Sequence, residues 1–205
     1  AQAIQNKDTI IWQSIETDTH FEQHLLADTA MSSAIKLEQS ADRTVLAQKI
    51  IPPLTLIIIG GNHIAVTLSK LAKIMGYHII LVDPRTAFAT IERFPDADMI
   101  ITQYPHRAFQ ELVITPSTAI AILAHDPKID DTALDIALQS SAFYIGALGG
   151  RKTQAQRRER LQKMGLSATN IERLHAPIGL DIGAETPEQI ALAILAEIVA
   201  CQNNL

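Results

Sequence analysis

Short apolar runs alternate with helix-period segments from Leu54 onward, and this alternation limits the possible folds more than any other feature of the 205-residue sequence. Short, mostly apolar runs are typical of parallel strands in a sheet that helices cover on both faces. The alternation therefore predicts an α/β fold with an open parallel sheet of about five strands flanked by helices. The predicted strands are Leu54–Ile59, His78–Val82, Asp98–Thr102, Thr118–Leu123 and Ala142–Ile145.

Capping residues place helices between and after these strands. Asp130 or Asp131 is positioned to cap a helix after the fourth strand. The last helix has the fullest signal, because Thr186 is a good N-cap, Pro187 suits the first helical position and Gln189 completes a capping box.

Residues 1–51 do not share this rhythm. Thr9–Ile15 and Thr44–Ile50 look like strands, polar sequence separates them, and two consecutive prolines follow. We therefore predict a small β-containing segment over residues 1–51, a remnant or reduced N-terminal domain, and a Rossmann-like domain over residues 52–205.

Composition excludes several classes of protein. The formal net charge of −5 argues against a surface for duplex nucleic acid. Cys201 is the only cysteine, so the sequence contains neither an internal disulfide nor a zinc site of paired thiolates. No apolar run reaches the roughly 18 residues of a membrane span, and the first residues lack a secretory pattern. We expect a cytoplasmic protein that binds neither nucleic acid nor a membrane.

The first predicted strand turns into its helix through Gly60, Gly61, Asn62 and His63, where a dinucleotide-binding fold carries its glycine fingerprint. Asn62 stands where the second glycine of that fingerprint lets the backbone approach a pyrophosphate. Asp83 follows the second strand, where an acidic residue would hold a ribose hydroxyl. The turn is therefore either part of an NAD(P) site or a tight strand-to-helix turn beside a helix-capping acid.

Four polar loops follow predicted strands, and ligands of open parallel sheets bind beyond the carboxyl ends of the strands. We therefore expect one ligand crevice there rather than four unrelated turns. The residues predicted to bind in it are Gly60, Gly61, Asn62, His63, Asp83, Arg85, His125, Asp126, Gly146, Gly149, Gly150, Arg151, Lys152 and Thr153.

The glycine-rich corner after the fifth strand predicts a phosphate site. Gly149 and Gly150 let the backbone bend closely around a ligand, and the following helix begins with unpaired amides and a partial positive charge. Arg151 and Lys152 add full positive charge. The remaining basic residues of this helix are interpreted as a solvated face: Arg157, Arg158, Arg160 and Lys163.

The sequence identifies no catalytic residue and no metal site. His125, Asp126, Asp130 and Asp131 have metal-ligating side chains, but their spacing matches no recognised metal signature. No serine stands in a nucleophile-elbow setting, and Cys201 falls at the end of the final helix.

Six motifs, in this order, resemble the Rossmann domain of the XdhC and CoxI family, over about Pro52 to Ala200. They are IIIGGNHIA, VDPRTAFAT, RFPDAD, AHDPKIDDTAL, YIGALGGRKTQAQRRERL and APIGLDIGAETPEQIALAILAEIVA. The family usually has Gly-Ala-Gly-His where this chain has Gly60, Gly61, Asn62 and His63. It usually has Gly-Ser-Arg-Arg-Thr-His where this chain has Gly149, Gly150, Arg151, Lys152, Thr153 and Gln154.

The resemblance implies an accessory protein for molybdenum hydroxylases of the xanthine dehydrogenase type, rather than an enzyme. Such proteins bind molybdenum cofactor (molybdopterin) as cargo and assist its sulfuration and insertion. The implied partners are the hydroxylase apoenzyme and a cysteine desulfurase, and the family and the apolar N-terminal strands favour a homodimer. Two alternatives stay open: an NAD(P)-dependent oxidoreductase and a nucleotide-sensing Rossmann module.

Overall fold

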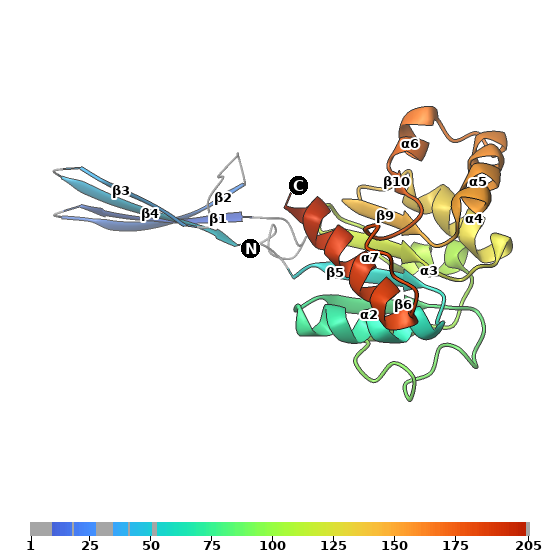
Figure 1. The fold of residues 1–205 in the computed structure, drawn as a ribbon. Helices are drawn as coiled ribbons and strands as arrows, with labels where there is room; N and C mark the ends of the chain where they lie inside the picture. The colour runs from blue at the N-terminus through green and yellow to red at the C-terminus, as the bar shows by residue number, and fades with distance from the viewer. Residues whose placement is uncertain (1–9, 18, 28–34, 41, 51–52, 204–205) are drawn as a thin grey trace. The chain divides into compact units, whose positions relative to one another are not determined.

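The computed structural model describes residues 10–17, 19–27, 35–40, 42–50 and 53–203. The chain divides into two compact units, residues 1–53 and residues 54–205, within two residues of the predicted boundary. Each unit has its own sheet (Figure 1). The N-terminal unit is all β in its described part, and the C-terminal unit is α/β.

The N-terminal unit contains a four-stranded antiparallel sheet in the order β2-β1-β4-β3. The sequence predicted β1 (Ile10–Thr17) and β4 (Arg43–Ile50) but not β2 (Phe21–Ala27) and β3 (Ile35–Gln39). The two missed strands mix charged and apolar residues, and successive side chains of a strand point to opposite faces of the sheet. Their apolar residues are mostly exposed, so hydrophobicity gave little sign of them.

The C-terminal unit is a doubly wound parallel sheet, which confirms the predicted fold class. Its order is β10-β9-β8-β5-β6-β7, so the strands of this unit, counted along the chain, run 6-5-4-1-2-3 across the sheet. The sheet has six strands rather than about five, because the two-residue β10 is too short to produce an apolar run. The strands are β5 (Thr55–Ile59), β6 (His78–Val82), β7 (Met99–Ile101), β8 (Thr118–Ile122), β9 (Tyr144–Ala147) and β10 (Leu174–His175).

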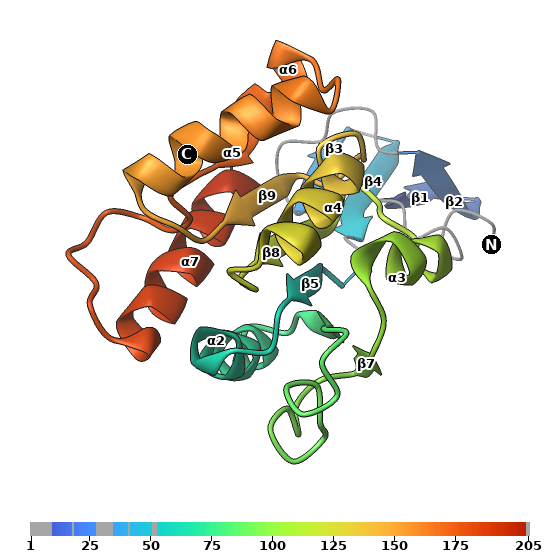
Figure 2. The same cartoon turned by 90° about the vertical axis from the view of Figure 1, so that its right-hand side faces the viewer.

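Alternate side chains of each central strand enter two different cores, because successive residues of a strand point to opposite faces. In β5, Leu56 and Ile58 pack with α2 and α7, whereas Ile57 and Ile59 pack with α3, α4 and α5. Figure 2 shows these helices on the two sides of the sheet. Each fully buried side chain of this size contributes about 1.5–3 kcal/mol. The helices are α2 (His63–Ile74), α3 (Pro105–Glu111), α4 (Pro127–Ala137), α5 (Arg151–Lys163), α6 (Ala168–Glu172) and α7 (Pro187–Gln202).

The predicted N-cap is confirmed for α7 and is wrong for α4. The Thr186 hydroxyl accepts from the Gln189 amide at 3.3 Å, and the Gln189 side chain accepts from the Thr186 amide at 3.2 Å. The capping box is therefore confirmed. Helix α4 is capped by Asp126, which accepts from the Lys128 amide at 2.9 Å, and not by either of the two later aspartates.

Strands β5 and β8 are neighbours, and the loops that leave their carboxyl ends lead to helices on opposite faces of the sheet. Gly60 begins one of these loops with a φ of +100°. A Cβ at this position would lie 2.5 Å from the Cα of Ala124 in the other loop. The close approach of the two loops therefore requires glycine.

Gly60→Ala should lower the free energy of unfolding by about 2 to 5 kcal/mol, because left-handed strain adds to a backbone clash. The matched control is Gly76→Ala. Gly76 also has a positive φ, of +82°, but nothing lies within 4 Å of its added Cβ. The control should lose only about 1 to 2 kcal/mol in urea unfolding. Equal losses in the two variants would contradict the close packing at Gly60.

Candidate functional site

A cleft of about 530 Å³ lies beyond the carboxyl ends of β8 and β9. Three loops form it: the loop after β8, which contributes His125, the loop between β9 and α5, and the loop that precedes α7. One face of α7 also lines it. Most of the lining is apolar or glycine, with one histidine, one arginine and one aspartate. The lining residues are His125, Leu148, Gly149, Gly150, Arg151, Pro177, Ile178, Gly179, Leu180, Asp181, Ile182, Ala184, Ile190 and Ala193.

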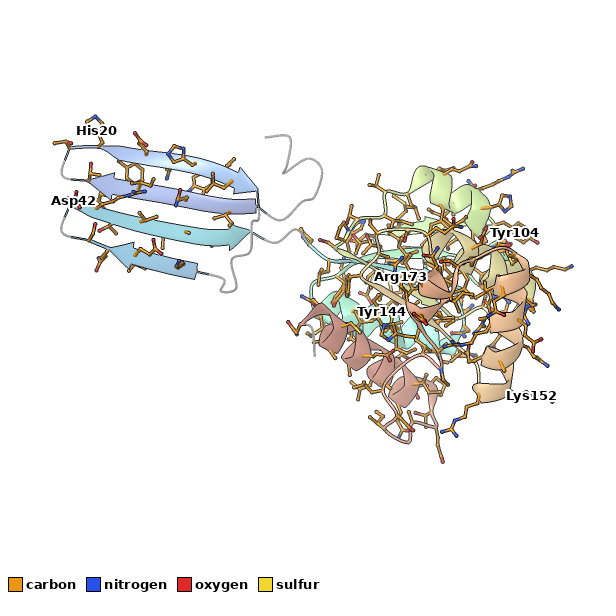
Figure 3. The ribbon with its side chains drawn as sticks, turned by 90° about the horizontal axis from the view of Figure 1, so that it is seen from above. His20, Asp42, Tyr104, Tyr144, Lys152 and Arg173 are labelled. Carbon is orange, nitrogen blue, oxygen red and sulfur yellow. The ribbon has the colours of Figure 1, made fainter. Side chains whose placement is uncertain are left out.

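The N-terminus of α5 opens onto this cleft. Gly149 turns the chain with a φ of +136°, and Gly150 is an N-cap without a side-chain hydrogen bond. The first amides of α5 therefore lack a side-chain acceptor within the described residues. Arg151 is exposed and lines the cleft beside them. Lys152 lies at the same end of the helix but outside the lining (Figure 3). This arrangement attracts an anion.

Buried side chains of α5 hold the corner in shape from behind. The Gln154 amide donates to the carbonyls of Ala147 at 3.1 Å and Gly149 at 2.9 Å. The Arg157 guanidinium donates to the carbonyl of Leu148 at 3.1 Å, and also to the side chain of Gln154. Three consecutive carbonyls are thus bound by two side chains from the helix that follows them.

Arg157 does not belong to a solvated face, so that interpretation is wrong for it, whereas the Arg160 side chain is 36% exposed and forms an ion pair. Arg157 is 1% exposed and donates to Asp130 at 3.1 Å, and Arg160 donates to Asp131 at 3.0 Å. The two aspartates lie on α4, which packs beside α5. A helix that buries charged pairs has no apolar stripe, so its buried side cannot be recognised from hydrophobic periodicity.

Burial raises the pKa of Asp130 to about 6, although the Arg157 guanidinium opposes this rise. One carboxylate oxygen of Asp130 and the Nε of Arg157 have no hydrogen-bond partner within the described residues. The ion pair is therefore incompletely satisfied, which is costly for buried charges.

His125 is the only non-glycine residue with a positive φ, 58°, in the described part of the chain. Left-handed backbone costs such a residue about 1 to 2 kcal/mol. Strained residues that line clefts often have a role in binding, because packing alone gains nothing from the strain. His125 lies in the cleft lining, in the loop that follows β8.

The loop before α7 completes the cleft, and the sequence reasoning missed it. Glu197 of α7 anchors its first part by accepting from the Gly179 amide at 2.8 Å and from the Tyr144 hydroxyl at 2.5 Å. Gly179 and Gly183 have φ values of +92° and +69°. Its glycines and proline in the motif APIGLDIGAETPEQ were the signal that could have revealed this loop.

The turn after β5 is filled by protein. The Asn62 side chain accepts from the Ala65 amide at 2.9 Å and donates to the carbonyl of Leu123 at 2.8 Å. The carbonyl of Phe88 lies against Gly61, where a Cβ would clash with it. Asn62 therefore caps α2 and bridges the two loops at the centre of the sheet, where the backbone of a dinucleotide-binding protein would meet a pyrophosphate.

Asp83 is also fully engaged. It is 0% exposed, accepts from the Gly61 amide at 2.8 Å, and accepts from the backbone and guanidinium of Arg85 at 2.7–2.9 Å. Burial alone would raise the pKa of Asp83, but the hydrogen bonds from Arg85 and Gly61 hold it below its ordinary value. A carboxylate with these partners has little capacity left for a ribose hydroxyl, so the geometry does not support the NAD(P) alternative.

The structure divides the predicted crevice. His125, Gly149, Gly150 and Arg151 line the cleft. Gly146 lies within β9, where a Cβ would meet the Ile178 side chain and the Tyr144 hydroxyl, each at 2.5 Å, so it serves packing. The other predicted residues lie outside the lining: Gly60, Gly61, Asn62, His63, Asp83, Arg85, Asp126, Lys152 and Thr153.

Two further findings concern only the described ranges. No group of three or more His, Cys, Asp or Glu side chains is placed to hold a metal ion. No helix there combines the length and the apolar content of a membrane span.

The free energy of unfolding should fall as the pH rises from about 4 to about 7, through the titration of Asp130. Its folded-state pKa of about 6 exceeds the ordinary value of 3.8, so the folded state binds this proton more tightly. The stabilisation of the folded state is complete below pH 3.8, the ordinary pKa, and is lost as the pH rises through the folded-state pKa of about 6. The total loss is about 3 kcal/mol.

Urea unfolding at a series of pH values checks this prediction. Asp130→Asn should remove that part of the pH dependence. Asp135→Asn, on the same helix but bonded to Gln139, should keep the wild-type curve. A curve for Asp130→Asn that parallels the wild type would show that Asp130 is ionised in both states.

Comparison with known proteins agrees with this fold. A family model described as "XdhC Rossmann domain" matches residues 56–198. A probable xanthine dehydrogenase subunit of Bacillus subtilis (strain 168) is 35% identical over 159 residues, which are 77% of this chain and 46% of that protein. "Molybdenum cofactor insertion chaperone PaoD" of Escherichia coli (strain K12) is 29% identical over 151 residues, which are 73% of this chain and 40% of that protein.

A crystal structure described as a xanthine dehydrogenase from Bacillus halodurans has the same fold, with a TM-score of 0.78 at 22% identity. The alignment covers 99% of this chain and 65% of that one. The chain thus spans less than half the length of the two relatives named above. Because the family model covers most of the α/β unit, the chain belongs to the XdhC Rossmann domain family.

Proposed function

We propose that this chain binds molybdenum cofactor and assists its insertion into a molybdenum hydroxylase of the xanthine dehydrogenase type. The names of two relatives support this role: one is a molybdenum cofactor insertion chaperone and the other is named for xanthine dehydrogenase. The observation that carries the proposal is the cleft at the N-terminus of α5, which combines an anion site with an apolar lining. The role is that of an accessory protein rather than of an enzyme.

The anion site is suited to the phosphate that molybdopterin carries. Backbone amides at the start of a helix bind phosphate through hydrogen bonds and the helix dipole. Arg151 can add a two-pronged, charge-assisted contact, because its guanidinium matches the geometry of phosphate oxygens. His125 lines the same cleft and can donate a further hydrogen bond.

The apolar lining is suited to the ring system of the cargo. Leu148, Ile178, Ile182 and Ile190 contribute to it from three different segments. Flat heterocycles bind in such clefts because apolar contacts remove water from both faces, while a few polar groups fix the orientation. The residues do not act on the cargo; they bind it, orient it and limit its contact with water.

The proposal extends to two partners and to sulfuration. A chaperone that inserts the cofactor must meet the hydroxylase apoenzyme, and delivery of the sulfurated form requires a sulfur donor such as a cysteine desulfurase. Both meetings would occur in the cytoplasm. Retention of each protein on the immobilised chain tests these partners separately.

We also propose that the chain self-associates through one face of its N-terminal sheet. Cross-strand pairs put Leu37 opposite Leu46 and Trp12 opposite Leu25 on this face. Several of its apolar side chains are exposed, including Ile35 at 60% and Leu37 at 58%. Large exposed apolar patches are typical of protein interfaces. Sedimentation velocity should show a dimer, and a monomer at all concentrations would contradict this proposal.

Arg151→Ala should weaken molybdopterin binding about 10- to 100-fold, the loss expected for one charge-assisted contact of about 1.5–3 kcal/mol. The matched control is Arg158→Ala, because Arg158 is exposed on the same helix and lies outside the cleft lining. The control should bind nearly as the wild type does. Titration calorimetry with molybdopterin and with NAD measures both affinities.

Equal losses at the two arginines would mean that α5 acts as a diffuse basic surface. Tighter binding of NAD than of molybdopterin would instead favour an NAD(P)-dependent oxidoreductase. A large fall in melting temperature of ligand-free Arg151→Ala would assign Arg151 a structural role.

A further inference from the structure

Asp181 provides the one carboxylate in the described lining of the cleft. It is exposed, and its side chain takes part in no hydrogen bond or ion pair with the described residues. Arg151 lines the same cleft without neutralising it through an ion pair. This carboxylate is notable in the cleft, because it would repel the phosphate of the proposed cargo.

The loop that carries Asp181 is bonded to α7 just before this residue and makes a tight turn around it. The Leu180 amide donates to the carbonyl of Ala193 at 3.2 Å, and the Ile182 amide donates to the carbonyl of Leu180 at 3.0 Å. Gly179 packs against the backbone of α7, where a Cβ would lie 3.0 Å from the Ile194 nitrogen. The backbone around the carboxylate is thus ordered by packing and hydrogen bonds. Preorganised groups of this kind bind ligands with less loss of entropy.

A carboxylate gains most from two parallel N–H donors, which it accepts with its two oxygens. The pyrimidinone ring of a pterin offers such a pair, because its 2-amino group and its adjacent ring N–H point in the same direction. Arginine has the same donor geometry, but a flat heterocycle also suits the apolar lining around Asp181. Ile178, Leu180 and Ile182 belong to the same loop and line the cleft with it.

We propose that Asp181 binds the 2-amino-4-oxopyrimidine edge of the pterin and so selects this ring system. The inference rests on the proposed function, because it assumes a pterin cargo. It adds Asp181, which would bind the ring, to the N-terminus of α5, which would bind the phosphate. Guanine has the same edge, so a purine nucleoside is the other source of this chemistry. The cleft would then hold its cargo at two points, the phosphate at α5 and the ring edge at Asp181.

The experiment compares three fluorescent or absorbing probes: 6-hydroxymethylpterin, the corresponding lumazine, in which a carbonyl replaces the 2-amino group, and guanosine. Wild-type chain should bind the pterin about 10- to 100-fold more tightly than the lumazine, because the carbonyl removes a donor and faces the carboxylate. Asp181→Asn should abolish this preference, because an amide offers one donor and one acceptor. Glu185→Gln is the matched control, since Glu185 is exposed in the same segment but outside the lining.

Molybdopterin titrated in parallel separates the two proposals. If it stabilises the wild type against heat but Asp181→Asn keeps the pterin preference, or the wild type has none, the role of Asp181 is overturned and the proposed function stands. If molybdopterin does not stabilise the wild type, both are overturned. Guanosine bound more tightly than the pterin would overturn the assignment to a pterin. Loss of the preference in Glu185→Gln as well would show a general charge effect and overturn the specific contact.

Discussion

The buried ion pair between Arg157 and Asp130 is the interaction on which the cleft depends. The same guanidinium that meets the carboxylate donates to the carbonyl of Leu148 and to the side chain of Gln154. Gln154 in turn binds the carbonyls on either side of Leu148. Taking charges out of water is expensive, and an incompletely satisfied pair contributes little net stability. Its value lies in geometry, because it fixes where the first turn of α5 faces.

Ligands of such sheets commonly bind at the central switch between strands, but in this protein side chains fill that position and the cleft lies beside it. At the switch between β5 and β8, Asn62 uses its side chain for a helix cap and for a bridge to Leu123. The carboxylate of Asp83 is bound by Arg85 and by the backbone of Gly61. Polar groups with satisfied partners offer little to a ligand. The turn after β9 leads into a helix whose N-cap, Gly150, makes no side-chain hydrogen bond, and the loop before α7 lines the cleft beside it.

This arrangement fits the proposed role of holding a cargo. The cleft has polar groups from separate segments. Such a site can orient a ligand through a few contacts without acting on it. Both relatives extend well beyond the region that this chain matches, because the matched residues make up 46% and 40% of their lengths.

The sequence by itself determined most of the parallel sheet, the cap of α7 and the family, because each depends on local patterns. Apolar runs mark buried strands, and a capping box needs only neighbouring residues. The four site residues that did line the cleft were also found locally, from a glycine corner and from a position after a strand. Tertiary structure alone decided the rest. Arg157 lies buried because an aspartate 27 positions earlier faces it. The loop of Asp181 lines the cleft because α7 holds it beside α5, and no local pattern encodes such distant contacts.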